Sequence, residues 1–156
     1  MTRDELCKLQ NDVHSDPDFS VYNSTSTRDE TNCYAHAIGA RYPKLQLYRI
    51  GTISGKKPIN ESYESIGEIL KLLLLDLDAL NLEFDMVKEE NSEIKLEDNQ
   101  HIIKLYVKIY PGNGKIGDFH FVRYDSDIGW TEKYRTFRER KVEENYYEKM
   151  EMYYQY

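Results

Sequence analysis

The chain has 156 residues, which is long enough for one domain with a hydrophobic core of ordinary size. Its hydrophobic content of 40% and charged content of 31% predict a folded chain and argue against extensive disorder. Its formal net charge of −7 argues against nucleic acid as a partner, because such binding requires Lys and Arg side chains that neutralise phosphates.

We expect a single domain over residues 1–156, in which an N-terminal helix and connection (1–29) precede the core (30–137) and a tyrosine-rich tail (138–156). The longest apolar stretch, "ILKLLLLDLDALNL", contains charged residues and is too short to cross a membrane. The first residues lack the apolar segment of a secretory signal peptide. These features predict a protein of the producing cell's cytoplasm, or one exported without a Sec signal, and no membrane partner.

The first predicted element is an amphipathic helix over residues 3–13, which begins with the capping-box spacing of Thr2 and Glu5 and carries Cys7. The polar segment 14–30 then predicts an extended connection on the surface. The chain has two cysteines and no secretory signal, so a disulfide is not expected and each thiol is judged alone.

The segment "NCYAHAIG" predicts a short helix, with Asn32 as its N-cap and Gly39 as its C-terminal breaker. Cys33 then lies in the first turn, where peptide dipoles favour the thiolate and backbone N–H groups can donate to an oxyanion. Cys33 is therefore a candidate nucleophile, and its own amide is a candidate oxyanion donor. The alternative is a core role, because free cysteines are often buried.

Four further segments with a predicted structure follow this helix. Residues 45–55 predict a strand or a loop, 62–80 a central core helix with a wide apolar face, and 82–87 a short strand. Residues 101–110 then alternate apolar and polar side chains, which is typical of a strand.

Two more strands are predicted, over 118–125 and 130–137, and the tail after them is expected to be a docked helix or a partly ordered end. The order of elements, helices first and then an antiparallel meander, predicts an α+β fold.

His120 lies in the second of these strands and is a candidate base for Cys33. If Tyr124 pairs with Trp130 across the turn, Glu132 lies diagonal to His120 on the same face of the sheet. A carboxylate there would hold the imidazole in one tautomer and stabilise the imidazolium. Asp118, two residues before His120 on the same face, is the other candidate for this orienting role.

The segments "NCYAHAIG", "GDFHFVRYDSDIGW" and "TEK" resemble the papain-like superfamily of cysteine peptidases, in particular its bacterial NlpC-type and CHAP amidase branches. The resemblance covers about residues 30–135. It implies a papain-like core with Cys33 as nucleophile, His120 as base and Glu132 as the polar third residue.

The resemblance leaves the side-chain oxyanion donor open between Asn32, Asn23 and Gln46. It implies a cysteine-dependent hydrolase or acyltransferase that acts on amide bonds of a peptide, peptidoglycan or protein substrate and needs no cofactor. His36 is a further candidate, either as an alternative base or as half of a metal site with Cys33, but zinc needs three or four ligands and no second pair is evident.

Two alternatives to an enzyme remain. One is a binding or inhibitor module of the same fold without turnover, acting through its acidic surface and tyrosine-rich tail. The other is an unrelated α+β domain in which Cys33 belongs to the core.

Overall fold

A computed structural model gives the structure of the chain, and the residues that it describes are 21–23, 28, 31–39, 49–57, 62–86, 96–97, 100–109, 112, 114–126, 128–133, 138–143 and 154–155. The elements are η2 (Val21–Asn23), α3 (Cys33–Ile38), α4 (Ile66–Ala79), β1 (Ile102–Ile109), β2 (Ile116–Asp125), β3 (Gly129–Lys133), β4 (Glu139–Lys141) and β5 (Tyr154–Gln155). The α+β class is confirmed. The predicted helix over 3–13 lies outside the described residues.

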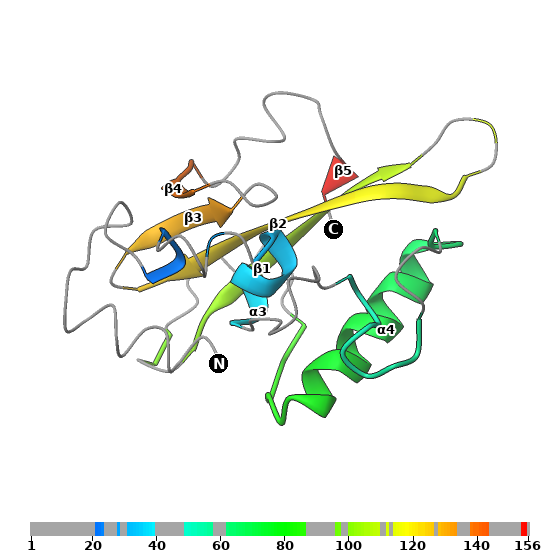
Figure 1. Cartoon of the computed structure of the whole chain (residues 1–156), viewed down its shortest axis with the longest axis horizontal. Coiled ribbons are helices and arrows are strands. Elements are labelled where there is room, and N and C mark those ends of the chain that lie inside the picture. Colours follow the sequence, from blue (N-terminus) through cyan, green and yellow to red (C-terminus); the bar gives the residue numbers. More distant parts are fainter. Residues whose placement is uncertain are drawn as a thin grey trace.

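The strands form one antiparallel sheet in the order β4-β3-β2-β1-β5 (Figure 1). Strands β1 to β4 follow one another as a meander, and β5 pairs with β1 at the opposite edge. The strands predicted over 101–110, 118–125 and 130–137 correspond to β1, β2 and β3. Both edge strands, β4 and β5, come from the tail, and residues 154–155 form a strand where a docked helix is one of the two expectations.

The sheet buries a different set of side chains on each face. On β1, Leu105 and Val107 belong to the main core, together with Phe121 of β2, while Tyr106 and Val122 belong to a smaller cluster. The alternation predicted for β1 is therefore observed. Helices α3 and α4 both contribute to the main core, and so this cluster joins the cysteine-bearing helix to the sheet.

Helix α3 begins and ends where the sequence predicts. The side chain of Asn32 accepts a hydrogen bond from the N–H of Ala35 at 3.0 Å, and Gly39 adopts the left-handed conformation with φ of 74°. The ring of Tyr34 contacts the ring of Phe121 edge-on at 5.3 Å between centroids. These contacts fix Cys33 at the start of a helix that is packed on the sheet.

Helix α4 begins at Ile66, four residues later than predicted. Ser65 is its N-cap and accepts a hydrogen bond from the N–H of Glu68 at 3.1 Å. Before this cap, the backbone oxygen of Tyr63 accepts a hydrogen bond from the N–H of Ile116 in β2. That bridge holds residue 63 in an extended conformation and so delays the start of the helix.

Residues 45–55 are predicted to be a strand or a loop, and their described part agrees with the loop, because residues 49–57 form turns. These turns pack against Asp76 of α4. Asp76 is fully buried and accepts hydrogen bonds from the N–H groups of Gly51 (2.7 Å) and Ser54 (2.8 Å). Tyr34 donates its hydroxyl hydrogen bond to the same carboxylate at 2.6 Å. A buried carboxylate thus ties the turn, α4 and α3 together.

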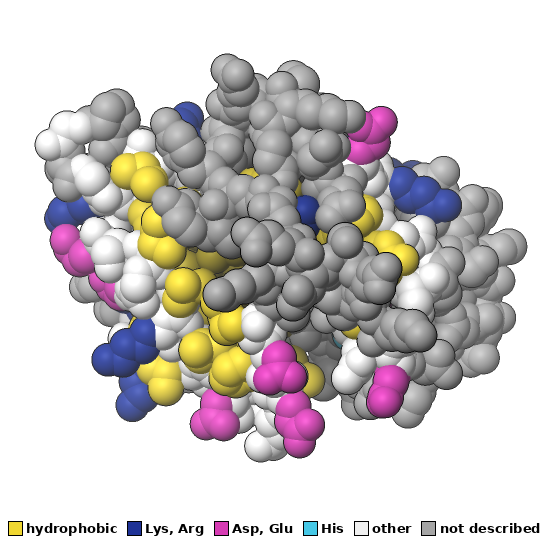
Figure 2. Space-filling view, turned by 180° about the vertical axis from the view of Figure 1, so that it is seen from behind, with side chains coloured by type: hydrophobic (Ala, Val, Ile, Leu, Met, Phe, Trp, Pro, Cys, Tyr) yellow, Lys and Arg dark blue, Asp and Glu magenta, His cyan; other side chains and the backbone are white. Residues whose placement is uncertain are grey.

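The short strand predicted for 82–87 is also wrong in its described part, since residues 82–86 have no strand partner. Their apolar side chains, Leu82, Phe84 and Met86, are exposed instead of covering a sheet face. Hydrophobic side chains gather on the side of the molecule that carries α4 when it is viewed from behind (Figure 2). No helix in the described part of the chain is long and apolar enough to cross a membrane.

Candidate active site

The structure brings Cys33, His120 and Glu132 together from α3, β2 and β3. All three side chains are buried, with residue exposures of 7%, 2% and 0%. The cross-strand pairs Tyr124–Trp130 and Val122–Glu132 are the ones expected from the sequence. This register places Glu132 diagonal to His120 on one face of the sheet.

His120 is hydrogen-bonded to both of the other proposed site residues. Its Nε2 lies 2.8 Å from Oε2 of Glu132, and its side chain also forms a hydrogen bond with Cys33. Burial by itself lowers the pKa of His120, but hydrogen bonds and negative charge from Cys33 and Glu132 outweigh burial and raise it to about 9. The site therefore favours a protonated imidazole beside the Cys33 side chain at neutral pH.

Glu132 has a second cationic partner that the sequence reasoning missed. Arg140 of β4 lies directly opposite Glu132, and its Nε donates to Oε1 at 2.5 Å. The two oxygens of the buried carboxylate are thus divided between Arg140 and His120. The sequence carries a weak signal for this contact, a basic cluster at 135–141, but it gives no register for β4.

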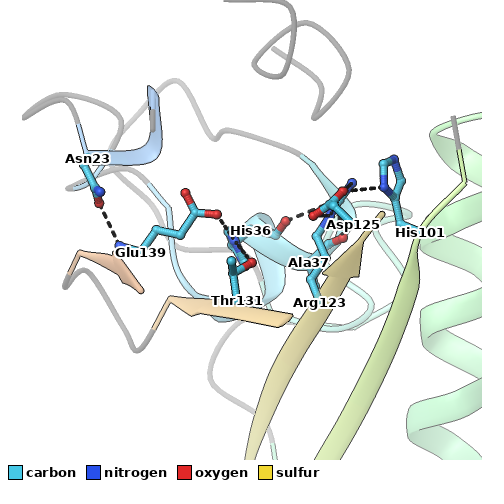
Figure 3. A network of polar contacts seen from close by, with 8 residues as sticks. All are labelled: Asn23, His36, Ala37, His101, Arg123, Asp125, Thr131 and Glu139. Atoms are coloured by element: carbon cyan, nitrogen blue, oxygen red, sulfur yellow. Dashed lines mark hydrogen bonds and ion pairs between the residues drawn. The ribbon is translucent and has the colours of Figure 1, made fainter. Parts of the chain in front are cut away.

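Buried basic side chains hold both ends of the segment that carries Cys33. At the end of α3, Arg123 of β2 donates to the backbone oxygen of Ala37 at 2.8 Å, and its guanidinium is paired with Asp125 (Figure 3). Before α3, the ammonium group of Lys133 donates to the backbone oxygen of Thr31. These contacts anchor α3 on β2 and β3, the two strands that carry His120 and Glu132.

The histidine of α3, His36, forms hydrogen bonds with residues outside the group of Cys33, His120 and Glu132. It is fully buried, and its Nε2 lies 2.8 Å from Oε1 of Glu139 on β4 and 3.4 Å from the hydroxyl of Thr131 (Figure 3). His36 is therefore placed as a member of a second buried histidine–glutamate pair, and His120 is the histidine that bonds Cys33.

The other candidates differ in position. Asp118 is exposed and accepts a hydrogen bond from the N–H of Phe119, so the carboxylate that bonds His120 is Glu132. The side-chain oxygen of Asn32 caps α3, and only its Nδ2 can donate to an oxyanion. Asn23 accepts from the N–H of Glu139, and Gln46 lies outside the described residues.

Among the residues that the structure describes, no three His, Cys, Asp or Glu side chains gather in a way that could hold a metal ion. The comparisons with models of protein families, with curated proteins and with solved structures find no match to this chain. The arguments about its chemistry therefore rest on the geometry of Cys33, His120 and Glu132.

Proposed function

We propose that the protein is a papain-like cysteine hydrolase or acyltransferase that cleaves an amide bond in a peptide or peptidoglycan-like substrate. The observation that carries this proposal is the chain of contacts from Cys33 through His120 to Glu132. A nucleophile, a base and a group that orients the base are the three parts that such chemistry requires.

In the proposed reaction, the Cys33 sulfur attacks the carbonyl carbon, and the C–N bond breaks as His120 passes its proton to the leaving nitrogen. The resulting thioester is attacked by water, or by an amine in the acyltransferase variant, and His120 removes the proton of this second nucleophile. The C–S bond then breaks, which releases the acyl product and returns the Cys33 sulfur to its starting state. Glu132 stabilises the imidazolium that is present before the first proton transfer and forms again in the second.

The start of α3 supplies the group that stabilises charge on the substrate. The first N–H groups of a helix have no partner within it, so the amide of Cys33 can donate to the oxyanion of the tetrahedral intermediate. Asn32 Nδ2 is the proposed side-chain donor, because Asn32 directly precedes Cys33 and its other side-chain atom holds the helix cap.

The test is the pH dependence of Cys33 alkylation by iodoacetamide, measured by peptide mass spectrometry in a Cys7→Ser background. An ordinary thiol loses about 300-fold in alkylation rate between full ionisation and about pH 6. We expect wild-type Cys33 to lose far less over this range and His120→Ala to lose the full amount.

An ordinary thiol profile in both proteins would contradict the proposal. If Cys33 is activated by His120 but no peptide or cell-wall substrate is turned over, the binding module without catalysis is the better description. Cys33→Ser is the matched control for turnover, because it keeps the shape of the side chain and removes the sulfur.

A further inference from the structure

The guanidinium of Arg49 lies over two aromatic rings beside the turn over residues 49–57. Its guanidinium carbon lies 5.4 Å from the ring centre of Tyr63 and 5.8 Å from that of Phe119. The side chain also forms a hydrogen bond with the Tyr63 hydroxyl group, whose own hydrogen bond goes to the backbone oxygen of Ile50 at 2.8 Å. Stacking on rings orients a guanidinium and leaves its edge for hydrogen bonds.

A second cation on the same ring has a different environment. Lys57 lies 5.6 Å from the ring centre of Tyr63, but its ammonium group is paired with the carboxylate of Glu68 at 2.6 Å. Within the described part of the chain, no carboxylate is paired with Arg49. In a chain with 28 acidic and 21 basic residues, an ordered arginine without an acidic partner is a candidate for binding an external anion.

The rings connect Arg49 to the candidate active site. Phe119 directly precedes His120 in β2, and its ring contacts that of Tyr34 edge-on at 6.4 Å between centroids. Tyr34 directly follows Cys33 in α3. Arg49 is thus linked to the residue that follows Cys33 by two ring contacts of 5.8 Å and 6.4 Å, and an extended peptide bound at Cys33 spans a separation of that order with about five residues.

We propose that Arg49 binds a carboxylate group of the peptide substrate, so that the enzyme prefers acidic peptides. This inference rests on the proposed function, because it assumes that the substrate reacts at Cys33. The guanidinium edge donates two parallel hydrogen bonds to a carboxylate, and the partly exposed position of Arg49 beside apolar rings strengthens them by limiting solvation.

The experiment uses pairs of thiol reagents that differ only at their far end. Each reagent is an iodoacetyl group followed by a chain of none to several glycines, which ends in a carboxylate or in the matching amide. Alkylation of Cys33 is measured in the Cys7→Ser protein at neutral pH. At the spacer length that reaches Arg49, we expect the carboxylate reagent to react about tenfold faster than its amide.

Three variants make the experiment specific. Arg49→Gln is expected to bring the ratio of carboxylate to amide rates to about one. Arg49→Lys should leave an intermediate ratio, because lysine keeps the positive charge but lacks the paired N–H donors of the guanidinium. Lys57→Gln is the matched control, because it removes a cation from the same ring and should leave the ratio unchanged. If Arg49→Gln fails to fold, as judged by circular dichroism, Arg49→Lys carries the test.

The outcomes separate the two proposals. If Cys33 has an ordinary thiol profile, the proposed function is overturned. If Cys33 is activated but the ratio stays near one at every spacer length, or is high and unaffected by both Arg49 variants, the carboxylate site is overturned and the proposed function stands. If Lys57→Gln also brings the ratio to about one, the preference for the carboxylate reagent comes from the general positive potential of this region, and the specific site at Arg49 is overturned.

Discussion

The molecule contains two buried histidine–glutamate pairs that look alike and are placed differently. His120 bonds Glu132 and His36 bonds Glu139, each at 2.8 Å, and all four residues are at most 2% exposed. His120 has a hydrogen bond with Cys33, whereas the described hydrogen bonds of His36, which lies three residues from Cys33 on the same helix, go to Glu139 and Thr131. A buried histidine with a carboxylate is therefore not enough to mark a base; the ring must also face the nucleophile.

The difference follows from where each histidine is attached. His36 is on α3 itself, and its ring contacts β3 and β4 through Thr131 and Glu139. His120 is on β2, the strand on which α3 packs, and reaches the first turn of α3 from the sheet. We infer that the pair formed by His36 and Glu139 stabilises the packing of α3, while the pair formed by His120 and Glu132 acts as the base and its orienting carboxylate for Cys33.

The largest expected effect is on stability, in the pair that does not contact the thiol. Glu139→Ala leaves His36 buried without its carboxylate, which should lower the free energy of unfolding by about 3 kcal/mol in a denaturant titration. The rate of Cys33 alkylation in the folded protein should stay unchanged. An exposed control, Glu83→Ala, should change stability by less than about 0.5 kcal/mol. A large loss of thiol reactivity in Glu139→Ala would mean that the two pairs share one role.

The second effect is on reactivity. Glu132→Gln keeps the size of the side chain and removes one of the charges that raise the pKa of His120, so less imidazolium is present beside Cys33 at neutral pH. We expect Cys33 to be alkylated about 30-fold more slowly near neutral pH, equivalent to about 2 kcal/mol. Glu139→Gln is the matched control and should leave the rate unchanged. Equal rates for wild type and Glu132→Gln would remove Glu132 from the orienting role.

The sequence predicts the part of this site that depends on local signals. Asn32 and Gly39 set the ends of α3, and the turn between β2 and β3 sets the register that brings Glu132 to His120. These features depend on residues close together in the chain, for which capping and cross-strand pairing rules are sufficient.

The features that the sequence reasoning missed depend on contacts between distant residues. The pairing of β4 with β3 brings Arg140 to Glu132, and the bridge of Tyr63 to Ile116 delays the start of α4. Neither has a turn or a periodic pattern that fixes it in advance. The short strand expected at 82–87 fails for the same reason, because a β-prone stretch forms a strand only where a partner edge is present.

A third test is the dependence of stability on pH. The pKa of His120 is about 9 in the folded protein and near 6.5 when unfolded, so its contribution is fully present below pH 6.5 and is lost as the pH rises through 9. Part of the shift depends on the charge of Cys33, so we expect about 1.5 kcal/mol of this contribution to be lost over that range. In denaturant titrations, His120→Gln should reduce this loss of unfolding free energy with rising pH, and Glu139→Gln should leave the loss unchanged.

The smallest expected effect concerns Arg140, the cation on the far side of Glu132. Its side chain is 59% exposed, so solvent screens the pair and its energy is small despite the 2.5 Å contact. Removing it frees Oε1 of Glu132 and lets the carboxylate rotate away from His120. Arg140→Gln should therefore slow Cys33 alkylation near neutral pH by about threefold, while Arg140→Lys recovers part of the rate.

The Arg140 test separates orientation from charge. If Arg140 mattered only through its charge, its loss would favour the imidazolium of His120, and alkylation would become faster. A slower rate with partial recovery by lysine therefore indicates that Arg140 acts by holding Glu132 in place.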